Sequence, residues 1–175
     1  MAPERRPFFI LLAACTLFIT LSACNRPTPR PIPQEGTPVP HFTLKDLAEK
    51  PFDLDKLSGN VIVLNFWAPW CKPCRTEMPS LQRLSTINNT GKKLKIFTVL
   101  YGSNTGPAAD FMRQNGLTLP VLVDGNLDVA RSYGVTGVPE TFIIGKKGIL
   151  RKKVIGPMNF ESPEALTFFE KLLNE

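Results

Sequence analysis

The chain has 175 residues, 43% of them hydrophobic, and 21 Lys and Arg against 15 Asp and Glu give a formal charge of +6. This length fits one domain with tails, and the composition excludes collagenous and intrinsically disordered chains. The single histidine excludes a two-cysteine, two-histidine zinc finger and a multi-histidine catalytic centre, so we expect no bound metal. The mild charge comes without a groove-reading motif, and nucleic acid is not an expected partner.

Residues 1–23 predict an export signal. A basic start precedes a largely apolar run over 8–21, which is too short to span a membrane and is typical of a signal peptide. The small residues before Cys24 resemble a bacterial lipobox, in which Cys24 is lipidated and becomes the mature N-terminus. The alternatives are an ordinary signal peptide cleaved after Ala23 and an uncleaved anchor. In every case we expect the chain to leave the cytoplasm. The expected location is the periplasm or the extracytoplasmic face of a bacterial membrane, with a lipid anchor at Cys24.

Residues 24–40 predict a tether between the membrane and a folded domain. Six prolines lie in this stretch, and such a composition favours an extended, semi-rigid spacer. A disordered tether and a proline-rich recognition segment are the alternatives. The domain itself is expected over residues 41–175.

Strands and helices alternate along the domain. Short strands are expected near 42–44 and 52–54, and the apolar run 61–67 predicts a strand buried on both faces. A helix over 72–87 should follow, broken or kinked at Pro79. The remaining expected elements are strands at 95–100, 121–123, 141–144 and 150–155 and helices at 107–114, 127–133 and 163–173, with a hairpin turn at Gly148. This alternation indicates an α/β fold with a central mixed β-sheet flanked by helices.

A Cys-x-x-Cys motif, Cys71 and Cys74, lies where the buried strand meets the helix. The positive potential of a helix N-terminus lowers the pKa of the first thiol, so we expect Cys71 to be the exposed nucleophile and Cys74 the resolving thiol. Thiolate attack on a target disulfide forms a mixed disulfide, and the second thiol then releases the reduced product. Such a redox-active disulfide requires no cofactor.

Other interpretations of the motif are weaker. A zinc knuckle needs two further ligands, and covalent haem attachment needs a histidine where Arg75 stands. A static disulfide is an alternative in an exported protein, although so short a loop removes little entropy from the unfolded chain.

The spacing of Trp67, Cys71 and Pro79, together with Val138-Pro139 further along, resembles the thioredoxin fold. More narrowly it resembles the TlpA/ResA/CcmG family of extracytoplasmic thiol–disulfide oxidoreductases. The resemblance implies a thioredoxin-like fold over residues 38–175. It also implies that the Val138–Pro139 bond is cis and lies against the disulfide, which leaves the backbone of Val138 free to pair with an extended substrate segment.

Two glutamates are candidates for acid–base and tuning roles. Asn65 stands where thioredoxin has an acidic residue, so the acid–base role must lie elsewhere. Glu77 resembles a glutamate of ResA-type proteins; it is either a buried carboxyl that exchanges the proton of Cys74 or a solvated side chain on the helix. Glu140 resembles the glutamate in the Pro-Glu-Thr of CcmG-type proteins, where it would tune a thiol or contact substrate. The alternative is a charge at a strand edge.

Substrate contacts are expected from Trp70, Lys72, Pro73 and Val138. Trp70 should be a partly exposed lid, whereas Trp67 should be core. Pro73 removes one N–H donor from the nucleophile's sulfur and so favours a reducing couple, while the charge of Lys72 acts in the opposite direction. A basic cluster near the C-terminal hairpin predicts a charged edge that discourages aggregation, or a surface for anionic lipid or an acidic partner. Its members are Lys146, Lys147, Arg151, Lys152 and Lys153.

The predicted function is a membrane-anchored, extracytoplasmic thiol–disulfide oxidoreductase that reduces disulfides of exported proteins. The resemblance suggests apocytochrome c as a client, and an upstream membrane thiol reductant is needed because the compartment is oxidising. We expect a monomer. The alternatives are a disulfide oxidase or isomerase on the same fold, a metal chaperone or binding module, and a thiol peroxidase of the AhpC/TSA type. Ala68 disfavours the peroxidase, which would have a Thr-x-x-Cys motif.

Overall fold

Seven consecutive buried residues make β3 (Val61–Trp67) an inner strand of the sheet, as their apolar pattern predicts. The computed structural model describes residues 31–87 and 93–175. The other strands are β1 (Thr43–Asp46), β2 (Pro51–Asp53), β4 (Leu94–Tyr101), β5 (Val121–Asp124), β6 (Glu140–Ile144) and β7 (Leu150–Ile155). The helices are η1 (Leu54–Leu57), α2 (Lys72–Ile87), α3 (Thr105–Gln114), α4 (Asp128–Ser132) and α5 (Pro163–Asn174).

The strands form one mixed sheet in the order β2-β1-β5-β4-β3-β6-β7. The inner strands β3, β4 and β5 are parallel, whereas β6 runs antiparallel to β3, and β7 antiparallel to β6. The carboxyl end of β3 therefore meets the carboxyl ends of β4 and β7 and the amino end of β6 at one edge of the sheet. The α/β fold with a central mixed sheet is confirmed.

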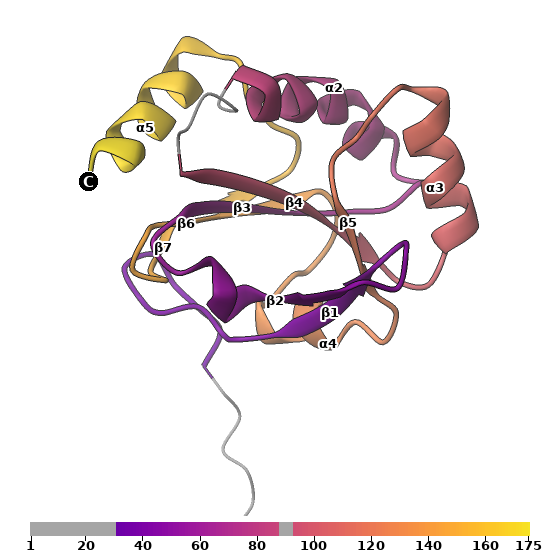
Figure 1. Cartoon of the computed structure of the whole chain (residues 1–175), viewed down its shortest axis with the longest axis horizontal. Coiled ribbons are helices and arrows are strands. Elements are labelled where there is room, and N and C mark those ends of the chain that lie inside the picture. Colours follow the sequence, from indigo (N-terminus) through magenta and orange to yellow (C-terminus); the bar gives the residue numbers. More distant parts are fainter. Residues whose placement is uncertain (1–30, 88–92) are drawn as a thin grey trace, which may run out of the picture. The chain divides into compact units, whose positions relative to one another are not determined.

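Two apolar clusters lie on the two faces of the sheet. Helices α2, α3 and α5 cover one face (Figure 1). Helix α4 lies on the other, where Phe42 and Phe52 from the β1–β2 segment belong to the same apolar cluster as its side chains.

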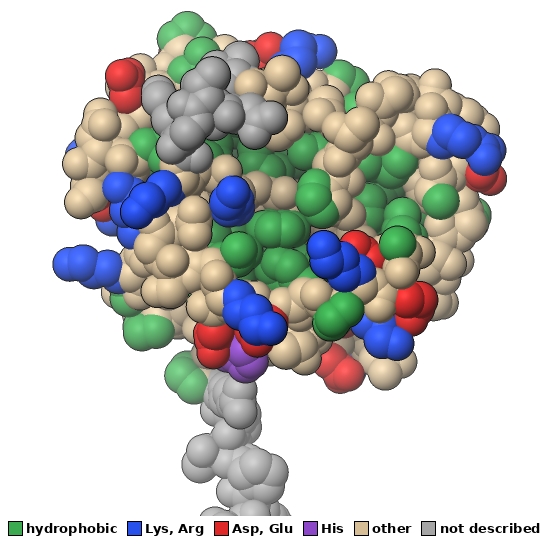
Figure 2. All heavy atoms as spheres, in the orientation of Figure 1, with side chains coloured by type: hydrophobic (Ala, Val, Ile, Leu, Met, Phe, Trp, Pro, Cys, Tyr) green, Lys and Arg blue, Asp and Glu red, His purple; other side chains and the backbone are tan. Residues whose placement is uncertain are grey.

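Side chains of β3 alternate between the clusters: Val63 and Trp67 belong to the first, and Leu64 and Phe66 to the second. By this alternation Asn65 faces the α2 side. In Figure 2 hydrophobic side chains occupy the middle of the face in view, and charged side chains lie around them.

The predicted helix and strand positions agree with the structure to within about two residues. Of the break or kink predicted at Pro79, the break is wrong. Helix α2 continues from Lys72 to Ile87 with Pro79 inside it. A proline inside a helix costs about 3 kcal/mol because it removes a hydrogen bond. On either side of Pro79, the side chains of Met78 and Leu81 are fully buried, and this packing holds the helix together across the missing bond.

The compact unit of the described chain begins at Pro31, before His41, where the sequence places the start of the domain. Gly36 N–H donates to the carbonyl of Leu150, and Val39 N–H donates to that of Gly148. The end of the proline-rich stretch is thus attached to the β6–β7 hairpin. The turn glycine of this hairpin, Gly148, has φ = 72°, a conformation that favours glycine.

The predicted signal peptide and the lipidation site Cys24 lie outside the described residues. Within residues 31–87 and 93–175, no helix has both the length and the apolar character needed to cross a membrane.

Candidate active site

The two motif cysteines lie at the start of α2, where the chain turns after β3. Cys71 and Cys74 are joined by a disulfide, with their Cα atoms 5.3 Å apart. The turn is closed by a hydrogen bond from Cys71 N–H to the carbonyl of Ala68 (3.1 Å). Cys74 N–H points to the Sγ of Cys71 at 3.2 Å. A helix N-terminus thus directs an N–H group and its positive potential at the sulfur of Cys71, which stabilises a thiolate there.

The two sulfurs differ in access less than the sequence predicts. Cys71 is 4% exposed and Cys74 is fully buried, so the expectation of an exposed nucleophile is wrong for the disulfide form. The reason is the loop before β6, whose Val138 carbonyl oxygen lies 3.5 Å from Cys71 Sγ. Cys71 nevertheless is the more accessible of the two.

The loop against the disulfide contains the cis peptide bond that the resemblance implies, between Val138 and Pro139. Pro139 is buried and Val138 is half-buried. The structure therefore brings Cys71, Cys74, Val138 and Pro139 together at one edge of the sheet, from segments that are distant in sequence.

Glu77 is buried, which decides between its two interpretations in favour of the buried carboxyl. It is 4% exposed. Its Oε1 accepts a hydrogen bond from Asn65 Nδ2, and its Oε2 accepts one from Met158 N–H, both at 2.8 Å. Burial raises the pKa of Glu77, and these two neutral donors offset the rise only in part. Glu77 lies one helical turn after Cys74, on the same side of α2.

Asn65 connects Glu77 to the strand that follows the cis proline. Its Nδ2 donates to Glu77 Oε1 and also to Thr141 Oγ1 (2.9 Å) on β6. Its buried Oδ1 has no hydrogen-bond partner among the described residues. The amide thus holds the two elements that flank the disulfide, α2 and β6, in one polar network.

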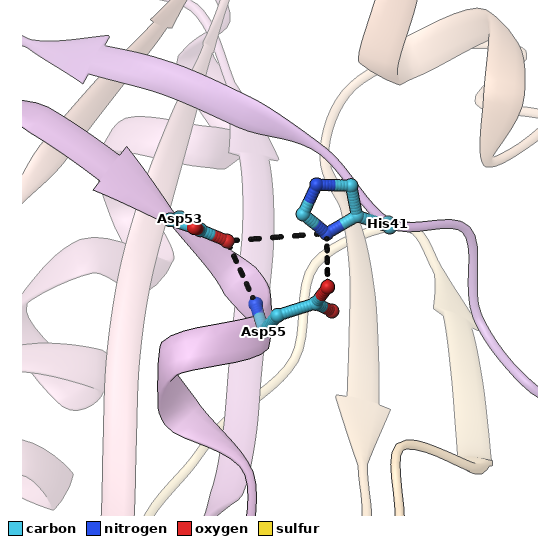
Figure 3. A group of neighbouring side chains, drawn as sticks. All are labelled: His41, Asp53 and Asp55. Carbon is cyan, nitrogen blue, oxygen red and sulfur yellow. Dashed lines mark hydrogen bonds and ion pairs between the residues drawn. The ribbon is translucent and has the colours of Figure 1, made fainter.

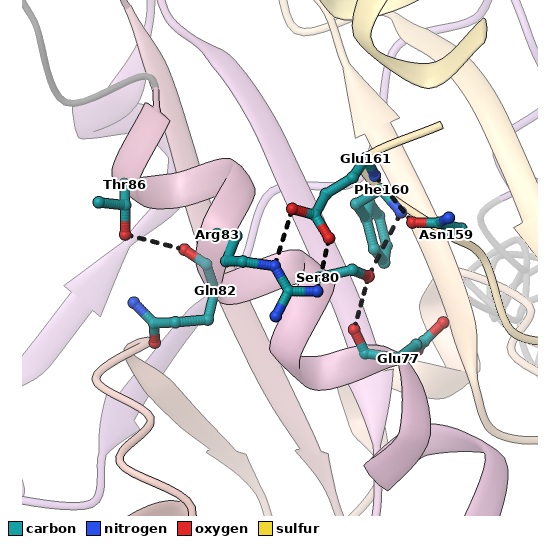
Figure 4. Close-up of polar contacts among 8 residues, drawn as sticks. All are labelled: Glu77, Ser80, Gln82, Arg83, Thr86, Asn159, Phe160 and Glu161. Atoms are coloured by element: carbon teal, nitrogen blue, oxygen red, sulfur yellow. Dashed lines mark hydrogen bonds and ion pairs between the residues drawn. The ribbon is translucent and has the colours of Figure 1, made fainter. Parts of the chain in front are cut away.

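The same helix is fastened to the segment before α5 (Figure 4). Ser80 Oγ donates to the carbonyl of Glu77 (2.8 Å) and accepts from Phe160 N–H (3.3 Å). One turn further, Arg83 Nε donates to Glu161 Oε1 at 2.7 Å. These contacts fix the position of the helix that carries Cys74 and Glu77.

Glu140 is also buried, with 1% exposure, and its carboxylate is turned toward its own loop and not toward solvent. Oε1 accepts hydrogen bonds from Thr136 N–H and Oγ1 (both 2.8 Å) and from Gly137 N–H (3.3 Å). Oε2 lies 2.9 Å from the ammonium of Lys153. Burial acts to raise the pKa of Glu140, but the Lys153 ammonium and the hydrogen bonds from Thr136 outweigh it, so the pKa is lowered. A strand-edge charge does not describe this residue.

Lys153 is a site residue that sequence reasoning missed, because it was grouped with a solvated basic cluster. Its Nζ also donates to the carbonyl of Gly134 (2.9 Å) and lies 5.0 Å from the ring centre of Phe142. Most side chains of the basic cluster contact other groups of the same domain. Lys146 donates to the carbonyl of Leu173, and Arg151 is paired with Glu175.

A groove runs beside the disulfide between the turn after β3 and helix α3. Its volume is about 530 Å³, and Trp70, Arg75 and Phe111 are among its lining residues. Trp70 is 63% exposed and Trp67 is fully buried, as predicted. Lys72 and Pro73 are exposed at the first turn of α2.

One group among the described residues has the composition of a metal site. His41, Asp53 and Asp55 each place one ligand atom within 4.8 Å of the others (Figure 3). His41 Nδ1 lies 3.0 Å from Asp55 Oδ2, and Asp53 Oδ1 caps η1 by accepting from Asp55 N–H. The contact between His41 and Asp55 and the helix cap account for this arrangement without a metal.

Comparison with known proteins agrees with this geometry. The sequence model of the AhpC/TSA family matches residues 36–153. The thiol–disulfide oxidoreductase ResA of Geobacillus thermodenitrificans is 34% identical over 156 residues, which are 89% of this chain and 88% of that protein. The thioredoxin-like protein YneN of Bacillus subtilis is 34% identical over 134 residues, 75% of this chain and 77% of that protein.

Solved structures give the same result. A protein from Chlorobium tepidum assigned as the thiol:disulfide interchange protein DsbE has a TM-score of 0.74 at 26% identity, covering 81% of this chain and 99% of its own. StoA from Bacillus subtilis has a TM-score of 0.63, also at 26% identity, over 80% of this chain and 99% of its own. The chain therefore belongs to the AhpC/TSA family and is a thiol–disulfide oxidoreductase with a thioredoxin-like fold, related to ResA.

Proposed function

We propose that this oxidoreductase is exported, is anchored in a membrane through lipidated Cys24, and reduces disulfides of other exported proteins. The observation that carries the proposal is the Cys71–Cys74 disulfide at the N-terminus of α2, against the Val138 carbonyl. The predicted leader and tether support export and anchoring. The surrounding compartment is oxidising, so an upstream membrane thiol reductant must supply the electrons.

The reaction begins with the reduced dithiol. The Cys71 thiolate, stabilised by Cys74 N–H and the helix N-terminus, attacks one sulfur of the client disulfide and forms a mixed disulfide. The other client sulfur leaves as a thiolate. Cys74 then attacks Cys71, the second client thiolate leaves, and the client is reduced while the Cys71–Cys74 disulfide forms.

Cys74 must lose its proton in a fully buried position. Glu77 is the buried carboxyl one turn away, and its raised pKa suits it to accept that proton when Cys74 attacks. Glu140 has a different role: it holds the loop that bears Val138 and does not contact substrate. Trp70, Lys72, Pro73 and the Val138 backbone remain the surface that a client segment meets.

The resemblance to ResA- and CcmG-type proteins points to the cysteine pair of apocytochrome c as a client. The direction of electron flow is tested by the reduction potential of the Cys71–Cys74 couple, measured by equilibration with glutathione or dithiothreitol. A potential below about −220 mV is expected of a dedicated reductant. A potential above about −160 mV would identify a disulfide donor, and the reductant proposal would fall.

The order of the two thiols is tested by single substitutions. Cys71→Ser should abolish reduction of a protein disulfide, whereas Cys74→Ser should accumulate mixed disulfides with clients, because the resolving step is lost. Non-reducing gels and mass spectrometry would detect the trapped species. Trapping by Cys71→Ser, and not by Cys74→Ser, would reverse the assignment.

The AhpC/TSA match favours thiol peroxidase as the second candidate. Ala68, three residues before Cys71, leaves that position without the hydroxyl expected of the peroxidase motif. Hydrogen peroxide consumption by the reduced protein decides between the two. Turnover faster than reduction of a protein disulfide would favour the peroxidase.

A further inference from the structure

Two unpaired cations lie next to the disulfide. Lys72 stands between the cysteines, and Arg75 directly follows Cys74; both side chains are exposed. Most exposed arginines of the described chain are held by carboxylates, for example Arg83 by Glu161 and Arg131 by Asp128. Neither the Lys72 ammonium nor the Arg75 guanidinium has an ion-pair or hydrogen-bond partner among the described residues.

No exposed acid in the neighbouring turns offsets these charges. The turns beside the disulfide at this edge of the sheet are residues 68–70, 102–104, 133–139 and 156–162. The one acid in them, Glu161, is paired with Arg83. Glu77 and Glu140, the carboxylates of α2 and β6 at this edge, are buried and engaged within the domain. The face around the disulfide is therefore positive.

The groove beside the disulfide adds an apolar element to this positive face. It is lined by Pro69, Trp70, Arg75, Pro107, Asp110 and Phe111, among others. The one acid among these six, Asp110, is paired with a cation, because its Oδ1 lies 2.8 Å from the guanidinium of Arg113. Trp70, at 63% exposure, is one of the few large hydrophobic side chains that the described chain leaves exposed. A segment crossing this groove would meet aromatic and proline surface with a cation at its side.

We propose that the disulfides reduced by this protein lie in segments that carry acidic residues beside the reactive cysteine pair and an apolar side chain that enters the groove at Trp70. The inference rests on the proposed reducing function and adds the chemistry of the client. Lys72 and Arg75 attract the acidic segment and raise the rate of encounter, and the groove orients it across Cys71.

The test uses the reduced full chain and two synthetic peptides that each contain one Cys-x-x-Cys disulfide and one Phe. The peptides differ only in the residues that flank the cysteines, two Asp in one and two Lys in the other. We expect the acidic peptide to be reduced about tenfold faster at about 0.01 M salt. This ratio should approach one at about 1 M salt, where exposed charges are screened.

The variant that tests the cation is Arg75→Glu, with Arg75→Gln as a second variant that keeps a neutral side chain. Both should lower the ratio, and Arg75→Glu should lower it further. The matched control is Lys50→Glu, the same change of charge at an exposed lysine in the β1–β2 turn, which should leave the ratio unchanged. A small uncharged disulfide, 2-hydroxyethyl disulfide, reports thiol reactivity separately, and its rate should not follow the peptide ratio.

Equal rates for the two peptides, or a ratio that salt and Arg75→Glu leave unchanged, would overturn the inference while the reducing function stands. If the protein reduced none of the three disulfides, the two peptides and the small disulfide, the proposed function would be overturned, and the inference with it.

Discussion

Glu77 and Glu140 lie on two sides of the same disulfide, and both are buried, at 4% and 1% exposure. Their surroundings differ in the number and charge of the donors. Glu77 receives hydrogen bonds from two neutral donors, the Asn65 amide and the Met158 N–H. Glu140 receives backbone and hydroxyl donors and, in addition, the ammonium of Lys153.

The two carboxyls therefore titrate in opposite directions. Burial raises the pKa of Glu77, whereas the Lys153 ammonium and the Thr136 donors overcome burial and lower the pKa of Glu140. A carboxyl with a raised pKa is suited to proton exchange, and a carboxyl with a lowered pKa is suited to holding a loop through its charge. The Lys153 ammonium and the loop donors of Glu140 thus separate a chemical role from a structural role.

The largest expected effect follows from removing that cation. Lys153→Met leaves the Glu140 carboxylate buried without its counter-charge, which should lower the free energy of unfolding by about 3 kcal/mol at neutral pH. Glu140 should then resemble Glu77, with a raised pKa, and part of the loss should be recovered as pH falls. Urea unfolding at several pH values measures both effects.

Lys152→Met is the matched control, because this neighbouring lysine is exposed and its Nζ lies over the Phe168 ring at 5.3 Å, with no carboxylate partner among the described residues. Its cost should be under about 1 kcal/mol. If the two lysine variants were equally stable, the Lys153–Glu140 pair would have no special role. Lys153→Arg, which keeps the charge, should recover more stability than Lys153→Met.

The next effect is the pH dependence due to Glu77. A carboxyl whose folded pKa is raised stabilises the fold below its unfolded pKa, near 4.5, and this stability is lost as pH rises through the folded pKa. Glu77→Gln resembles the protonated acid and should lose none of it. Wild type should therefore become less stable relative to Glu77→Gln by about 1 kcal/mol as pH rises to neutrality. A difference that does not vary with pH would contradict the raised pKa.

Glu140→Gln sharpens the comparison by its opposite sign. The folded pKa of Glu140 is lowered, so its stabilisation is present above the unfolded value and is lost as pH falls through the folded pKa. Wild type should gain stability relative to Glu140→Gln as pH rises, by about 1 kcal/mol or more. The measurement is the same series of urea titrations, and two slopes of the same sign would refute the assigned contrast.

The smallest effect is expected at the exposed ion pair on the Glu77 side of the site. Arg83 and Glu161 have side-chain exposures of 57% and 31%, so water screens their attraction. Arg83→Ala should lower the free energy of unfolding less than any other variant here, and salt should remove most of the difference. A loss as large as that of Lys153→Met would mean that burial does not distinguish the two pairs.

Local sequence patterns predicted most elements of the fold. Three local features could be predicted without tertiary structure: the apolar run of β3, the Cys-x-x-Cys at the following turn and the glycine of the hairpin. Each depends on only a few neighbouring residues. Pro79 is the exception, because its local preference against a helix interior is overridden by the buried side chains on either side. The Cys-x-x-Cys motif also indicated which residues form the site, whereas the hydrogen-bond partners of Glu77 and Glu140 are seen only in the structure.

The sequence by itself determined the strand, the two cysteines and the helix that presents them, because these features depend on neighbours in the chain. Only the tertiary structure decided the state of the two carboxyls, whose partners are distant: Met158 lies 81 residues from Glu77. Strand pairing decides which lysine, Lys152 or Lys153, lies next to Glu140. An irregularity at Ile143/Ile144 shifts the hairpin register, so that Phe142 pairs with Lys153. Without this irregularity Lys152 would pair with Phe142 and lie on the same face of the sheet as Glu140. A shift of one residue moves every side chain of a strand to the opposite face.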